Sequence, residues 1–289
     1  MQAVNPSPEL PVRVITPHDG TDAFRHAAGS ILSDLPFTLN LAWRMFRRDT
    51  TAQFRGSFLG WFWIIIPTLA NSLVWIFLGS SVIQIDSGPV PYPLFVFVGN
   101  LLWATFSGCL LGGLGVLGEA QGALSKVNFP QEALVLVVFG KSLLNVLVTL
   151  LALPVFLMMY PVQWHVEMLL FPVGLLLTMT CGLCFGLLLV PIAALFSDLN
   201  RAIQLGMRFA FFLTPVVFPL PSAGYARTLM LWNPATSLIV TSRAWLLGGE
   251  STDLLAVVCI SMGSVLLLML SVIALKVAIP HIVERTSGG

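Results

Sequence analysis

The chain has 289 residues, of which 57% are hydrophobic and only 9% are charged. Soluble domains carry about 25% charged residues, so this composition excludes a water-soluble globular protein and predicts an integral membrane protein. The 14 basic and 13 acidic residues nearly cancel and form no basic run, so nucleic acid is not an expected partner.

The first 34 residues form a polar, cytoplasmic tail in this prediction, and they lack the apolar stretch behind a basic start that marks a cleavable signal peptide. Residues 35–56 follow as an amphipathic segment, in which large apolar side chains alternate at helical spacing with Arg44, Arg47 and Arg48. We expect an interface helix lying in the headgroup layer. The alternative is that these arginines only flank the first span and snorkel to the membrane surface.

Six mostly apolar stretches approach or exceed the length of about 20 residues that a membrane-spanning helix needs. They are residues 61–83, 94–117, 133–159, 168–196, 202–218 and 254–278. The fifth is the weakest, because it is short, contains Arg208 and runs into three prolines. Two spacings, Gly108-x-x-x-Gly112 and Gly182-x-x-x-Gly186, predict a close approach between helices.

Residues 219–253 are too apolar for a simple outer loop and contain the helix-breaking pair Asn233-Pro234. We expect broken or re-entrant helices there, which are tolerated only where protein or water covers the backbone. The predicted fold is therefore an all-α integral membrane domain over residues 57–279, followed by a cytoplasmic tail over residues 280–289.

Basic residues are retained on the cytoplasmic side of a membrane. With the N-terminus inside, ten of the 14 Lys and Arg residues fall in inner segments and only Arg227 and Arg243 fall in outer ones. The remaining two, Lys141 and Arg208, lie within predicted spans. Both termini are therefore expected to be cytoplasmic.

The sequence lacks a phosphate-binding loop and a zinc-protease motif, and its acidic residues are too scattered for a paired-carboxylate site. The four histidines lie in tails or short loops, without a second ligand at metal-binding spacing. Cys181 and Cys184 lie in an apolar run, where thiols behave as small hydrophobes. We expect no catalytic site, no metal and no cofactor bound by this chain.

The first span carries a stripe of aromatic and hydroxyl side chains. At 100° per residue, six residues share one third of its circumference: Phe58, Trp61, Ile65, Thr68, Ser72 and Trp75. Aromatic faces stack on sugar rings, but the same pattern is typical of helix packing, which we prefer from the pattern alone. In the fifth span, Arg208 shares a face with Phe211 and Phe212, which joins a cation able to bind phosphate to flat apolar rings.

The segment from Glu119 to Glu132 is the one substantial inner loop between predicted spans. Its pattern fits either a short polar helix available to a cytoplasmic partner or a plain connecting turn. The residues that would make such a contact are Glu119, Lys126, Asn128, Phe129, Pro130 and Glu132.

A set of local motifs occurs in a fixed order between about residues 35 and 249. They are residues 54–60 (FRGSFLG) with Trp63 and Pro67, residues 90–97 (VPYPLFVF), residues 126–130 (KVNFP), Ser197-Asp198-Leu199, residues 214–218 (TPVVF), Asn233-Pro234 and residues 242–245 (SRAW). In order and spacing they resemble the permease subunits of type-2 ABC exporters, specifically those for O-antigen and teichoic-acid polysaccharides. One departure is Ser197, where the family has Arg before the Asp, with Arg201 following here.

The resemblance implies that two copies of this chain pair with two copies of a separate ATPase, which binds ATP and Mg. The implied substrate is a long glycan on a polyprenyl pyrophosphate lipid, exported across the bacterial inner membrane. In that family the amphipathic helix and the loop between spans two and three rest on the ATPase. Spans one and five line the channel, which would make the Phe58 and Arg208 faces part of the substrate path.

Two alternatives stay open at this point. One is a type-2 ABC permease for drugs or lipids, which would not need an aromatic and hydroxyl stripe. The other is a membrane-embedded glycan-processing enzyme, for which Asp198, Glu119 and Glu132 are the eligible inner acids.

Overall fold

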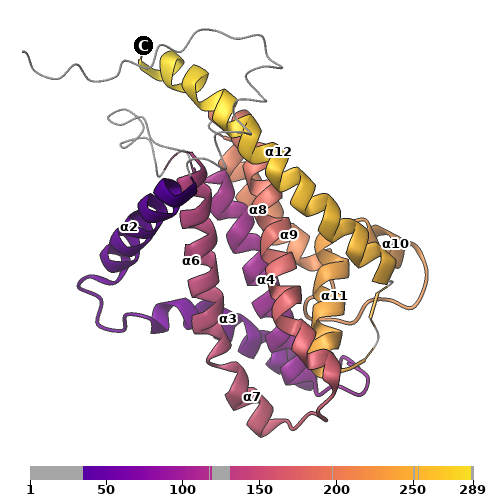
Figure 1. Ribbon diagram of the computed structural model, residues 1–289. Coiled ribbons are helices and arrows are strands. Elements are labelled where there is room, and N and C mark those ends of the chain that lie inside the picture. Colours follow the sequence, from indigo (N-terminus) through magenta and orange to yellow (C-terminus); the bar gives the residue numbers. More distant parts are fainter. Residues whose placement is uncertain are drawn as a thin grey trace, which may run out of the picture.

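The computed structural model describes residues 35–116, 118, 131–196, 198–249, 251, 252 and 254–287, with side chains up to Leu275. Every regular element in these residues is a helix, as predicted (Figure 1). Five helical segments of the described chain are long and apolar enough to cross a membrane: Phe62–Val82, Tyr92–Leu114, Glu132–Met159, Val166–Leu195 and Leu254–Leu275.

Helices α4 (Tyr92–Leu114) and α8 (Phe171–Leu195) form the centre of the bundle (Figure 1). They approach closely because Gly182 and Gly186 face α4: a Cβ atom at either position would meet the backbone carbonyl of Phe106 or Leu110. The close approach predicted for this glycine pair is confirmed. Gly108, from the other predicted pair, faces open space instead.

Three of the five spans are not continuous α-helices. The span Val166–Leu195 opens with a 3-10 turn before α8. Helix α3 (Phe62–Phe77) continues into a π-helical turn, η1 (Leu78–Val82). Helix α6 (Glu132–Leu150) ends before α7 (Leu153–Met159), which has Pro154 in its first turn. Because proline lacks an N–H and is best accommodated in the first turn of a helix, Pro154 accounts for the new start.

The fifth predicted span, residues 202–218, differs most from the expectation. Helix α9 (Leu199–Phe212) has 14 residues and is therefore about 21 Å long, shorter than the roughly 30 Å of a hydrocarbon core. An irregular segment over residues 213–224 follows, and then the short helix α10 (Tyr225–Leu231). The six-span count therefore stays a prediction.

Polar contacts fix this irregular segment against the centre of the bundle. The hydroxyl of Tyr92 on α4 donates to the carbonyl of Val217 at 3.0 Å, and the guanidinium of Arg243 donates to the carbonyl of Val216 at 3.0 Å. Non-helical backbone at membrane depth needs such partners, because lipid offers none.

Helix α11 (Pro234–Leu247) begins at Asn233, whose side chain accepts from the backbone N–H of Ala235 and donates to the hydroxyl of Thr214 at 2.8 Å. Twelve of its 14 residues are buried, mainly against α8 and α4. A helix this short and this well covered suits the predicted re-entrant element, which remains a prediction.

Two long helices flank the bundle. Helix α2 (Leu35–Phe54) lies in the predicted interface segment and packs chiefly against α6. A 3-10 turn, η2 (Val166–Leu170), precedes α8, and α12 (Leu254–Ser287) packs along α8 and continues past the bundle toward the C-terminus (Figure 1). Helices α3, α9 and α12 all keep one side bare of protein.

Candidate functional site

An aromatic cluster joins α3, α4 and α9. The ring of Trp75 lies 6.2 Å from that of Phe211 and 6.0 Å from that of Phe212, measured between centroids. Trp103 meets Phe211 edge to face at 6.0 Å. The structure thus brings together Trp75, Phe211 and Phe212, which the sequence analysis assigned to two separate spans. Phe211 is buried in the cluster, whereas Phe212 stays 54% exposed.

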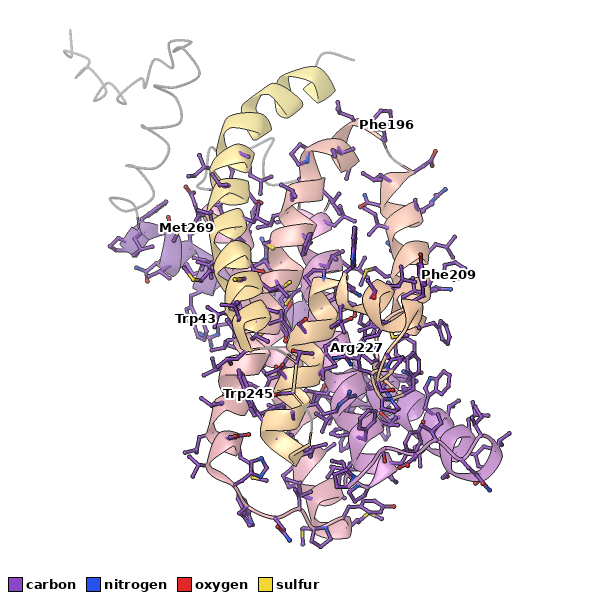
Figure 2. The ribbon with its side chains drawn as sticks, turned by 90° about the vertical axis from the view of Figure 1, so that its right-hand side faces the viewer. Trp43, Phe196, Phe209, Arg227, Trp245 and Met269 are labelled. Atoms are coloured by element: carbon purple, nitrogen blue, oxygen red, sulfur yellow. The ribbon has the colours of Figure 1, made fainter. Side chains whose placement is uncertain are left out.

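Polar residues follow one another along the bare side of α9. Arg201, Gln204 and Arg208 are all exposed and are three or four positions apart, so they lie on one side of the helix. Arg208 has no carboxylate within ion-pair distance among the described residues. Phe209, 63% exposed, adjoins it on the outer side of α9 (Figure 2). The sequence analysis missed Gln204, although its spacing from Arg208 was the available signal.

The predicted stripe of the first span divides into two parts. Phe58 is fully exposed and Trp61 stacks on Phe54 with 4.5 Å between centroids, both in the connection before α3. Thr68 and Ser72 are buried against α4. These two hydroxyls therefore lie between α3 and α4.

An amide and hydroxyl network holds α3 to α4 where the surroundings are apolar. Asn100 of α4 accepts from the side chain of Asn71 at 2.8 Å and donates to the hydroxyl of Ser72 at 3.0 Å. That hydroxyl donates in turn to the carbonyl of Thr68 at 2.7 Å. The sequence analysis missed Asn100, a lone amide within a long apolar run.

The predicted ATPase-coupling residues are only partly visible. Glu119, Lys126, Asn128, Phe129 and Pro130 lie outside the described residues. Glu132 is buried in the first turn of α6.

The predicted interface arginines lie on α2. Arg44, Arg47 and Arg48 point away from the bundle and are exposed. Arg48 pairs with the adjacent Asp49 at 3.0 Å. Arg44 and Arg47 therefore remain exposed to a membrane surface or a partner, and Arg48 is exposed while it pairs with Asp49.

An ion pair ties α2 to α6. Nζ of Lys141 lies 3.1 Å from a carboxylate oxygen of Asp49, and Gly140 leaves room for the ring of Phe46 beside it. Partial burial raises the pKa of the Asp49 carboxyl, but hydrogen bonds from Lys141 and Arg48, and their charges, outweigh burial and hold the pKa below its ordinary value of 3.8. Lys141, which the sequence analysis placed within a predicted span, thus has a defined partner.

Among the described residues, no group of three or more His, Cys, Asp or Glu side chains is placed to hold a metal ion. The charged groups of the described bundle are instead few and separate. What the site offers is an exposed cationic and aromatic side on α9, backed by the cluster at Trp75.

No protein-family model matches the chain. Comparison with known proteins finds relatives whose names describe the export or transport of polysaccharides. The chain is 34% identical over 204 residues to the O-antigen export system permease protein RfbA of Myxococcus xanthus, covering 68% of this chain and 76% of that protein. It is 23% identical over 210 residues to an RfbA of Klebsiella pneumoniae, covering 70% and 78%. It is 20% identical over 219 residues to the polysialic acid transport protein KpsM of Escherichia coli, covering 72% and 82%. The similarity extends over most of each protein.

Proposed function

The chain belongs to the permease subunits of ABC exporters for polysaccharides, and we propose that it forms the membrane-spanning part of an exporter for a lipid-linked glycan. The cargo is an O-antigen-like or teichoic-acid-like polymer on a polyprenyl pyrophosphate carrier. Two copies of the chain work with two copies of a separate ATPase that binds ATP and Mg. The complex lies in the bacterial inner membrane, with both termini of this chain in the cytoplasm.

This proposal rests mainly on the exposed side of α9, which includes Arg208 and Phe209. A guanidinium such as that of Arg208 is costly in hydrocarbon, so this side of α9 is unsuited to lipid and suits a second copy of the chain or a water-filled path. A guanidinium pairs well with phosphate, and the exposed rings of Phe209 and Phe212 offer flat faces for sugars. The substrate path therefore follows α9 and the adjoining α3, with Phe58 and Trp61 at its entrance.

The coupling to the ATPase runs through the cytoplasmic end of the bundle. We place the contact at α2 and at residues 119–132. The ion pair between Asp49 and Lys141 supports this placement, because a push on α2 passes directly to α6. Glu132, at the start of α6, stands where the proposed coupling segment joins that helix.

The topology that fits this function has six crossings. Five segments of the described chain qualify by length, and α9 supplies the remaining one with the irregular segment after it. Helix α11 then dips into the membrane from the outer side, covered by α8 and α4. An even number of crossings places both termini on one side.

The deciding experiment is glycan export from cells that carry this chain with its ATPase. Arg208→Gln and Phe212→Leu are expected to lower export at least about tenfold, the equivalent of roughly 1.4 kcal/mol, while the complex still assembles. Phe196→Leu is the matched control, because Phe196 is similarly exposed but lies at the end of α8 (Figure 2). Normal export by both α9 variants would refute the assigned path.

The same variants separate the alternatives. A drug or lipid permease would tolerate Phe212→Leu, because an apolar cargo gains nothing from a flat ring. A glycan-processing enzyme would lose product formation in Asp198→Asn or Glu132→Gln, whereas we expect glycan synthesis to continue in both. Co-purification with the ATPase in fixed stoichiometry tests the partner directly.

A further inference from the structure

A cavity of about 240 Å³ lies at the end of the bundle away from the C-terminus. Its walls come from three connections: the one before α4, the irregular segment after α9, and the one between α11 and α12. Two arginines line it, Arg243 of α11 and Arg227 of α10. Figure 2 labels Arg227 on this part of the molecule.

Arg243 is the more deeply buried of the two, with 5% of its surface exposed. Its guanidinium stacks on the ring of Phe95, 3.5 Å from the centroid, and one N–H donates to Val216. Guanidinium has five N–H donors, so most of them remain for another acceptor. No carboxylate of the described residues lies within ion-pair distance of it.

Burying the Arg243 guanidinium costs more free energy than its contacts with one ring and one carbonyl recover. A buried charge needs an opposite charge and further hydrogen bonds. Two of the other donors around the cavity are already engaged. The hydroxyl of Ser87 donates to the carbonyl of Val90, and the N–H of Gly88 donates to the side chain of Asp86. The positive charge of the cavity therefore comes from its two guanidinium groups, and the hydroxyl of Ser251 lines the same space.

Arg227 adds a second positive charge on the same cavity. One of its nitrogens donates to the carbonyl of Pro221 at 2.9 Å, and its remaining N–H groups are available. Two planar guanidiniums facing one space match the several acceptor oxygens of a phosphate better than a single carbonyl or hydroxyl ligand. The volume also leaves room for an ester substituent on that phosphate.

We propose that this cavity binds one phosphate group between Arg243 and Arg227. The phosphate comes either from a phospholipid headgroup or from free phosphate in solution. Once bound, it links α10 and α11 to the connection that precedes α4. This site does not depend on the export function, and none of its residues belongs to the proposed substrate path.

A competing source of negative charge lies within the chain. Glu250 and Asp253 belong to the connection between α11 and α12 by sequence, but both lie outside the described residues. If either carboxylate neutralised Arg243, the cavity would hold no external anion. Glu250→Gln and Asp253→Asn therefore form part of the test.

Two probes distinguish the sources. The full-length chain with its ATPase is purified with phosphatidylglycerol, and native mass spectrometry counts the lipids retained per chain. In parallel, inorganic phosphate is titrated into lipid-depleted complex while thermal unfolding is followed. A headgroup site retains lipid, whereas a free-phosphate site shows a saturable rise in unfolding temperature without lipid.

Arg227→Gln and Arg243→Gln are each expected to weaken the observed binding at least tenfold. Arg55→Gln is the matched control, because Arg55 is exposed in the connection between α2 and α3 and far from the cavity in sequence. Arg243→Gln also loses the hydrogen bond to Val216 and for that reason could fail to assemble. In that case the binding measured for Arg227→Gln decides the test, because Arg227 is only half-buried. Unchanged binding in Arg227→Gln overturns the proposal.

Two further outcomes overturn it as well. The first is wild-type protein that binds neither probe. The second is binding that appears only after Glu250→Gln or Asp253→Asn, which would show that the cation is neutralised from within the chain.

Discussion

Replacing Asp49 by Asn is expected to loosen α2 from α6. The carboxylate pairs with Lys141 at 3.1 Å, and each side chain is about a quarter exposed. At that distance the gross attraction is about 1 kcal/mol in water and about 5 kcal/mol at a protein surface. Side-chain ordering and desolvation remove most of it, as measured for comparable pairs, and leave a coupling energy of about 1 kcal/mol.

A double-mutant cycle isolates this energy from the packing around it. Asp49→Asn, Lys141→Met and the double variant are compared by unfolding of the purified complex in detergent. Asp49→Asn is expected to cost more than Lys141→Met, because the carboxylate of Asp49 retains Arg48 when Lys141 is lost. A coupling energy indistinguishable from zero would mean that the ion pair does not hold α2 in place.

The pH dependence of the unfolding free energy gives an independent check that the charged form of Asp49 stabilises the fold. The pKa of Asp49 is lowered by folding, so the stabilisation is fully present above its ordinary value of 3.8 and is lost as pH falls through the lower, folded value. The deficit of Asp49→Asn is therefore expected to be constant from about pH 5 to 8 and to vanish in acid. A deficit that grows as pH falls from 8 to 5 would contradict the assignment.

Three further substitutions test the packing, each by unfolding of the purified complex. Gly182→Ala would drive a Cβ into the carbonyl of Phe106 and is expected to cost about 3 kcal/mol, whereas Gly108→Ala, in open space, should stay within about 0.5 kcal/mol. Asn100→Leu removes two hydrogen bonds between α3 and α4 and should cost about 1 kcal/mol; a stabilised variant would show that the amide serves something other than this contact. Tyr92→Phe should lower the free energy of unfolding by about 1 kcal/mol, because it loses the hydrogen bond to Val217 in the irregular segment. An unchanged free energy of unfolding would mean that this hydrogen bond does not stabilise the fold.

Much of the bundle could be predicted because its information is local. Runs of more than 20 apolar residues have one stable form in a bilayer, so the helices of the four longest spans follow from composition. The glycine spacing at Gly182 and Gly186 likewise needs only the period of a helix. The end of α9 is harder, because whether Thr214-Pro215 kinks or ends a helix depends on the partners that Tyr92 and Arg243 provide to the backbone beyond it.

The site was predicted less completely because its contacts are not local. The helical period grouped Thr68, Ser72 and Trp75 on one side of the first span, but it could not say what each of them meets. Thr68 and Ser72 are buried beside α4, whereas the ring of Trp75 lies near Phe211 and Phe212 of α9. The pairing of Lys141 with Asp49 joins residues 92 positions apart. A pattern along one helix identifies a side of it, and only packing decides what that side meets.

The packing also indicates which bare helix sides face lipid. Up to Leu275, where the description of side chains ends, the exposed side chains of α12 are apolar, including Leu266 and Met269. Such a side is stable against lipid. The exposed side of α9 carries Arg201, Gln204 and Arg208, whose burial in hydrocarbon costs several kcal/mol. Helix α9 contacts the closely packed centre of α4, α8 and α11 through Phe211, with Ile203, Met207 and Ala210 partly buried beside it. The same side exposes the rings of Phe209 and Phe212. An exposed side that joins guanidinium groups to flat rings is suited to the wall of a path for a glycan, as proposed for α9.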